Sequence, residues 1–215
     1  MNGTTTLRKL MTEELRDIYH AERQLVKALP KMAKASTSRG LRDALENHLR
    51  ETEEHVSRLE QAFELIGESA RTKTCAGMLG IVEEGSDVIK EGEKGPALDA
   101  AIIAGGQRAE HYEIAVYGTL MSWAKALGHD DVAELLSATL EEEKAADEKL
   151  TELAEAGINQ AAKAGEEDED EEESDEAEDE DEEESSKGQR RQPAMAAAGN
   201  GRSRARGRSA SGQRR

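Results

Sequence analysis

Aromatic side chains, cysteines and long apolar runs are scarce in this chain of 215 residues. Phe, Trp and Tyr make up 2% of the residues, and Val, Ile or Thr do not alternate with polar residues as in strands, which argues against a β-sheet. Cys75 is the only cysteine, so no intramolecular disulfide can form and an oxidising compartment is not indicated. No apolar run approaches the roughly 20 residues that span a bilayer. We therefore expect an all-α protein in the cytoplasm, without a membrane segment.

Charge divides the chain into three parts. Residues 166–184 hold 17 acids in 19 positions, residues 187–215 hold nine Lys or Arg and no acid, and residues 1–165 carry about −10 of the net −18. Like charges without large apolar side chains cannot offset the entropy cost of ordering. We predict a folded domain over 1–162, a disordered acidic segment over 163–186 and a disordered basic tail, rich in Arg, Gly and Ser, over 187–215.

Helical periodicity is confined to the first of these parts. Apolar residues recur three or four positions apart in four long stretches, which predicts helices over about 7–35, 41–66, 96–127 and 131–156. The segment 68–95 is irregular apart from a short helical stretch around 81–89, so we interpret it as a long connection between two helical hairpins. Two hairpins joined by one long crossover are typical of a ferritin-like four-helix bundle.

One glutamate in each predicted helix stands in or beside the apolar stripe. Glu22, Glu110 and Glu143 take inward positions, and Glu51 lies at the edge of its stripe. An isolated ionised carboxylate in an apolar interior costs many kcal/mol, so converging carboxylates need a shared counter-charge, and a metal pair supplies it. The alternative is a misjudged register, with the carboxylates reaching solvent.

Further ligands come from neighbouring positions on the same helices. Di-iron bundles use a Glu-x-x-His pair on two helices, and that pair is missing here because residue 54 is Glu and residue 146 is Ala. The second ligand on these helices is then His55 or Asp147, one position later, or an acid, or there is none. His48 is either a ligand or a surface or hydrogen-bonded histidine. The predicted metal ligands are Glu22, Glu51, His55, Glu110, Glu113, Glu143 and Asp147.

Five strings in order resemble the YciE/YciF family of ferritin-like stress proteins over about residues 5–160. They are DIYHAERQ from Asp17, HLRET from His48, TCAGMLG from Thr74, EHYEIAVYGTL from Glu110 and TLEEEK from Thr139. The resemblance implies a four-helix bundle, a homodimer and a di-metal centre, with no settled activity. Glu110 and Glu113 are also similar to the double glutamate on the third helix of rubrerythrin, which implies an accessory ligand role for Glu113.

Three functions are compatible with these features. The first is a di-iron or di-manganese protein of the stress response that acts on oxygen or peroxide or holds metal, since hard oxygen ligands suit these metals. The second is a non-catalytic stress-protection or assembly protein. The third is a weak nucleic-acid contact, or a partner-protein contact, through the basic tail, opposed by the adjacent acidic segment. Whether the protein is an enzyme stays open at this point.

Overall fold

The computed structural model describes residues 5–165 of the chain. Most of these residues are helical, and no strand occurs among them. The predicted basic tail and all the acids of the predicted acidic segment lie outside the described residues.

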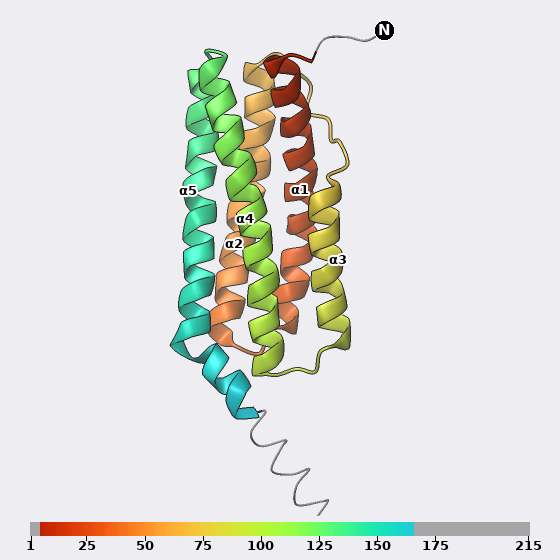
Figure 1. Ribbon diagram of the computed structural model, residues 1–215, viewed down its shortest axis with the longest axis vertical. Coiled ribbons are helices and arrows are strands. Elements are labelled where there is room, and N and C mark those ends of the chain that lie inside the picture. The colour runs from red at the N-terminus through yellow and green to blue at the C-terminus, as the bar shows by residue number, and fades with distance from the viewer. Residues whose placement is uncertain (1–4, 166–215) are drawn as a thin grey trace, which may run out of the picture. The chain divides into compact units, whose positions relative to one another are not determined.

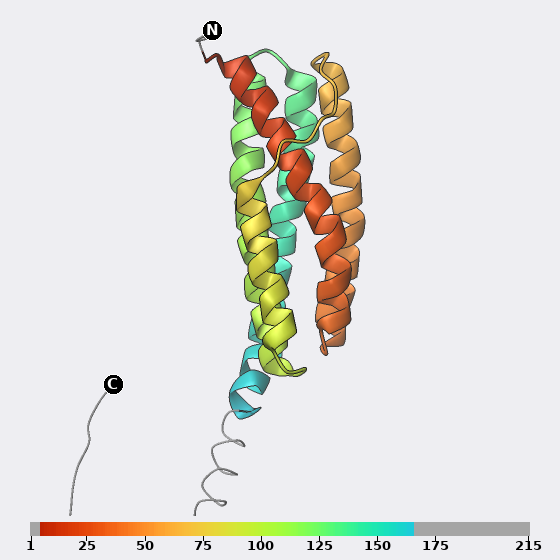
Figure 2. The same ribbon diagram turned by 90° about the vertical axis from the view of Figure 1, so that its right-hand side faces the viewer.

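Four long helices form an elongated bundle (Figures 1 and 2). They are α1 (Leu7–Ala35), α2 (Arg39–Leu65), α4 (Pro96–Ala126) and α5 (Asp130–Leu153). The most extensive contacts are those of α1 with α2 and of α4 with α5, and contacts of α2 with α5 and of α1 with α4 close the bundle. This confirms the all-α class and the ferritin-like arrangement of two hairpins.

Local sequence signals account for the helix ends. The Thr6 and Ser38 side chains accept hydrogen bonds from the backbone of Lys9 and Leu41 (both 3.3 Å), which caps α1 and α2. Pro96 lies in the first turn of α4, where a missing N–H costs nothing. Gly128, with φ of +75°, makes the left-handed turn between α4 and α5. Beyond α5 the chain kinks at Gly157, whose dihedrals (φ 162°, ψ −17°) are not helical, and helical residues continue past the kink to residue 165.

The crossover between α2 and α4 contains a fifth helix, α3 (Ala76–Glu91). Figure 2 shows the extended stretch before it crossing over α1, and α3 then packs against α1 and α4 on the outside of the bundle. The helix is longer than the predicted stretch around 81–89, because glycines within it weaken the helical signal of the sequence. One of them, Gly77, is required by packing, since a Cβ there would come within 2.9 Å of the Tyr112 ring.

Cys75 fastens the start of α3 to the bundle. Its sulfur accepts a hydrogen bond from the Met78 backbone (3.3 Å) and contacts the Tyr112 hydroxyl on α4 (3.0 Å). Its backbone N–H donates to His20 Nδ1 on α1 (3.1 Å). The buried thiol is therefore a cap that ties the crossover to two helices.

Asp99, in the first turn of α4, clamps the short connection between α1 and α2. Its buried carboxylate accepts hydrogen bonds from the Thr37 backbone (2.8 Å), the Thr37 hydroxyl (2.6 Å) and the Ser38 backbone (2.7 Å). Three donors satisfy a carboxylate that would otherwise be costly to bury. The clamp fixes one end of the α1–α2 hairpin against α4.

The core is made of the inward apolar positions of all five helices, including Leu15, Ile18, Phe63, Leu120 and Leu136. No helix in the described part of the chain is both long enough and apolar enough to cross a membrane.

Candidate metal centre

Four glutamates and two histidines of the described residues are buried within this apolar core. Glu22 comes from α1, Glu143 from α5, and two pairs come from the remaining long helices, namely His48 and His55 on α2 and Glu110 and Glu113 on α4. Each lies on its helix at the spacing of the buried stripe, so helix packing alone brings them together.

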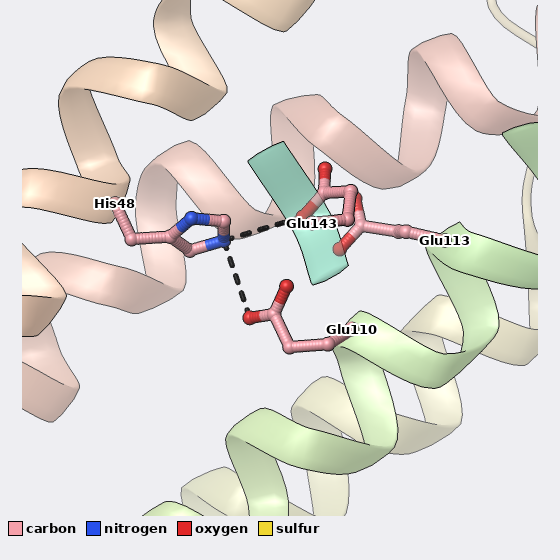
Figure 3. A group of neighbouring side chains, drawn as sticks. All are labelled: His48, Glu110, Glu113 and Glu143. Atoms are coloured by element: carbon pink, nitrogen blue, oxygen red, sulfur yellow. Dashed lines mark ion pairs between the residues drawn. The ribbon is translucent and has the colours of Figure 1, made fainter. Parts of the chain in front are cut away.

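The first group consists of His48, Glu110, Glu113 and Glu143, whose ligand atoms lie within 4.8 Å of one another. In Figure 3 the three carboxylates converge and the imidazole of His48 faces them from α2. His48 Nε2 lies 3.2 Å from Glu110 Oε1 and 3.8 Å from Glu143 Oε2. Three oxygens and one nitrogen are thus arranged around one point.

The second group consists of Glu22, His55 and Glu143. His55 Nδ1 lies 3.0 Å from Glu143 Oε1 and 3.5 Å from Glu22 Oε1. The Tyr117 hydroxyl on α4 donates a hydrogen bond to Glu22. Because Glu143 belongs to both groups, the two sets of ligands are adjacent and share one carboxylate.

Many polar atoms of the two groups lack a hydrogen-bond partner among the described residues. They are both oxygens of Glu113 and Glu143, one oxygen each of Glu22 and Glu110, both ring nitrogens of His48 and Nδ1 of His55. Some of these atoms are close to one another but are not aligned as hydrogen bonds. Native proteins leave few buried polar atoms unpaired, and a cluster of them facing inward fits the ligand shell of a metal ion.

The electrostatics of the cluster also favour a cation. Burial raises the pKa of Glu113 well above its usual range, and repulsion from Glu143 and Glu22 adds to this shift. Burial likewise raises the pKa of Glu143, to about 7, although a hydrogen bond with His55 works against it. Burial alone would lower the pKa of His55, but Glu143 and Glu22 raise it to about 10. Protons thus neutralise part of the cluster, and a divalent ion can take their place.

Outside the ligand groups, a second layer of polar side chains surrounds the two imidazoles. His55 Nε2 lies 2.8 Å from Glu142 Oε2, and Arg58 donates hydrogen bonds to both oxygens of Glu142. These bonds from Arg58 lower the pKa of Glu142, against the effect of its partial burial. Behind His48, Glu51 Oε2 lies 3.5 Å from Nδ1.

Five of the seven sequence-predicted ligands lie in the two groups: Glu22, His55, Glu110, Glu113 and Glu143. The other two lie outside them. Glu51 has a side chain 37% exposed and accepts a hydrogen bond from Asn47 (3.0 Å). Asp147 accepts a hydrogen bond from Gln107 (3.3 Å) and lies 3.3 Å from the exposed His111 ring.

His48 is the member of the cluster that the predicted ligand set omits. The signal for it is present in the sequence, because the buried residues of α2 follow one another at alternating steps of four and three: Leu41, Leu45, His48, Thr52, His55 and Leu59. Glu51 is one position off this series, which turns it by about 100° around the helix. The inward polar pair of α2 is therefore formed by two histidines seven residues apart.

A cavity of about 550 Å³ borders one end of the cluster. It lies mainly between α2 and α5, and its lining includes His48, Glu110, Glu51 and Ala146. A second hollow of about 700 Å³, mainly among α1, α3 and α4, is lined largely by apolar residues and also reaches Glu110. His55 and Glu22 border neither space.

Known proteins match the same part of the chain. The family model described as a domain of unknown function, DUF892, matches residues 6–163. Protein YciF of Escherichia coli K12 is 43% identical over 159 residues, which covers 74% of this chain and 96% of YciF. The crystal structure of that protein, described as a stress protein, superimposes with a TM-score of 0.70 over 73% of this chain and 99% of YciF.

Two further solved structures are similar. YcfI from Rhodopseudomonas palustris is 44% identical, with a TM-score of 0.67, covering 70% of this chain and 96% of its own. A protein from Xanthomonas campestris is 23% identical with a TM-score of 0.58, covering 74% of this chain and 98% of its own, and shares the fold. Because the DUF892 family model matches most of its length, the chain belongs to the DUF892 family, and YciF is a relative of it.

Proposed function

We propose that this protein binds a pair of iron or manganese ions between its four long helices and acts in the stress response on oxygen or peroxide. The observation that carries the proposal is the set of buried, unpaired ligand atoms in two groups that share Glu143. Four glutamates and two histidines form a donor set of oxygen and imidazole nitrogen, which suits iron and manganese and lacks the thiolates that softer metals prefer.

The residues divide into terminal and shared ligands. His48, Glu110 and Glu113 would hold one ion, Glu22 and His55 the other, and Glu143 would contact both. Tyr117 holds Glu22 in place by its hydrogen bond. The bound pair would supply Lewis acidity and exchangeable electrons to oxygen or peroxide.

Access for a small ligand is proposed at the His48 end. The cavity of about 550 Å³ borders His48 and Glu110 there, whereas His55 is fully buried and does not line it. Oxygen or peroxide entering this cavity would meet the first group of ligands. In the second group, Glu22 and His55 are fully buried and border neither space, although Glu142, which contacts His55 Nε2, also lines the cavity.

Metal content of purified protein tests this proposal. Protein prepared without chelator and loaded anaerobically with Fe(II) or Mn(II) is expected to hold about two ions per chain, measured by elemental analysis after desalting. The substitution Glu143→Gln removes the shared charge and should abolish binding of at least one ion. Glu141→Gln is the matched control, since Glu141 is exposed and pairs with Lys144. Wild-type protein that retains neither metal would contradict the proposal.

The relatives add a biological setting and an assembly. YciF is described as a stress protein, and we extend that role to this chain. We also propose that it forms a homodimer, as the family resemblance implies. Light scattering coupled to gel filtration should give the mass of two chains, and a concentration-independent mass of one chain would contradict the dimer.

A further inference from the structure

Glu142 differs from its neighbour Glu143, because its side chain lies against the outer side of a buried imidazole. The ring of His55 is completely buried, with Nδ1 directed to Glu143 and Glu22 and Nε2 directed to Glu142 Oε2 at 2.8 Å. An ionised carboxylate can only accept, so Nε2 is the donor in this contact. The contact leaves Nδ1 as the nitrogen that faces the second group of ligands.

Glu142 is itself held in place by Arg58. The guanidinium donates to both carboxylate oxygens, with Arg58 Nη2 2.9 Å from Glu142 Oε1 and Nη1 bonded to Oε2. Arg58 Nη1 also donates to Thr139 on α5 (3.3 Å). A two-bond pair of this kind fixes the orientation of the carboxylate as well as its position. Arg58 is one turn from His55 on α2, so the imidazole and its support are built on the same two helices.

The setting of His48 is different. Its Nδ1 lies 3.5 Å from Glu51, which is partly exposed and is also hydrogen-bonded to Asn47. Glu51 has no guanidinium among its hydrogen-bond partners or ion pairs within residues 5–165. Within residues 5–165, a carboxylate held by a guanidinium therefore supports the outer nitrogen of His55 but not that of His48.

We infer that Glu142, oriented by Arg58, is a positioning residue that keeps the proton of His55 on Nε2 and presents Nδ1 to the metal position formed with Glu22 and Glu143. The inference rests on the proposed metal binding and goes beyond it, because neither Glu142 nor Arg58 is a ligand. Partners of this kind, which hold the second nitrogen of a ligating histidine, change metal affinity about 10- to 100-fold in other metal sites.

Metal titration of three variants tests the inference. Glu142→Ala should weaken binding of one of the two ions about 10- to 100-fold, measured with Mn(II) or Co(II) against a chromophoric chelator, and leave the other ion unaffected. Glu142→Gln retains an acceptor oxygen and should restore part of the affinity, and Arg58→Lys should give an intermediate loss because it retains charge but not two-bond geometry. The exposed neighbour variant Glu141→Gln is the control and should match wild type.

A proton signal separates positioning from a merely structural role. In the Co(II)-loaded protein, the ring N–H of each ligating histidine should give a shifted, solvent-exchangeable NMR line. The His55 line should exchange slowly in wild type and faster in Arg58→Lys and Glu142→Gln, with the His48 line unchanged. If wild type binds two ions while Glu142→Ala keeps both affinities, or if the His55 line is insensitive to these changes, the positioning role is wrong and the proposed function stands. Wild type that binds no metal overturns both.

Discussion

His48 and His55 lie two turns apart on the same face of α2 and offer the same chemical group to one buried cluster, yet their surroundings differ. His55 is fully buried, and its outer nitrogen faces a carboxylate that is held by a guanidinium. His48 borders a cavity of about 550 Å³, and its Nδ1 faces the partly exposed Glu51. One helix therefore carries a supported imidazole and a more accessible one.

The difference shows how four long helices can surround two unequal candidate metal positions. Both groups contain Glu143, so the inequality comes from the other members of each group, three in one and two in the other, and from what surrounds them. A supported, closed position favours retention of an ion, and a position beside a cavity favours exchange with small molecules. Under the proposed function, the His55 end would anchor the metal pair and the His48 end would receive the ligand.

Removing each imidazole in turn should give the largest difference in stability between the two ends of the cluster. In metal-free protein, His55→Ala leaves Glu22 and Glu143 buried without their partner, so we expect the free energy of unfolding to fall by about 3–5 kcal/mol. His48→Ala should cost less, about 1–3 kcal/mol, because water in the adjoining cavity can solvate Glu110. Urea denaturation followed by circular dichroism measures both. Equal losses in the two variants would mean that the accessibility of the two ends does not differ in solution.

At the His55 end, the hydrogen bond from the Tyr117 hydroxyl to Glu22 should contribute to stability. This bond is buried, so Tyr117→Phe should leave an acceptor without a donor and lower the free energy of unfolding by about 1–2 kcal/mol. Tyr19→Phe is a suitable control, because the Tyr19 hydroxyl donates to Glu60 in a part-buried contact (2.6 Å). The control should lose about 0.5 kcal/mol. A larger loss in the control than in Tyr117→Phe would contradict the importance of the buried bond.

Filling the cavity beside His48 should change stability least. It should slow the entry of small ligands to the metal cluster. Ala146 lines the cavity, whereas Ala138 on the same helix is exposed and does not. Ala146→Leu should slow the association of azide with iron-loaded protein in stopped-flow absorbance, while Ala138→Leu should not. Both should keep their metal and stay within about 1 kcal/mol of wild-type stability. Unchanged azide association in Ala146→Leu would show that ligands reach the cluster by another route.

Much of the fold and most of the cluster follow from helical periodicity in the sequence. Glu22, Glu110 and Glu143 occupy positions where the stripe requires an apolar residue, and the first turn of α4 begins at Pro96 as predicted. These features depend only on spacing along a single helix, which a sequence states directly. The helix α3 is longer than the sequence pattern predicts, because its glycines weaken the local helical signal.

Other parts of the cluster depend on contacts between helices, which spacing alone does not give. Glu142 and Glu143 are adjacent in sequence, and only the packing of α5 against α2 decides that one faces the interior and the other supports His55. Glu51 and His48 pose the same problem on α2, since a long side chain at the edge of a stripe can reach either way. The role of an edge residue is thus set by the neighbouring helix.

The Asp99 clamp has a consequence for the lifetime of the folded state. It joins backbone positions that are 61 and 62 residues away in sequence, so it can form only after the chain has closed the loop that contains α2 and the crossover, and that closure costs entropy. We expect a contact that closes so long a loop to form late in folding, and contacts that are absent from the transition state chiefly slow unfolding. Loss of the Asp99 carboxylate would therefore raise the unfolding rate of the bundle more than it would lower the folding rate.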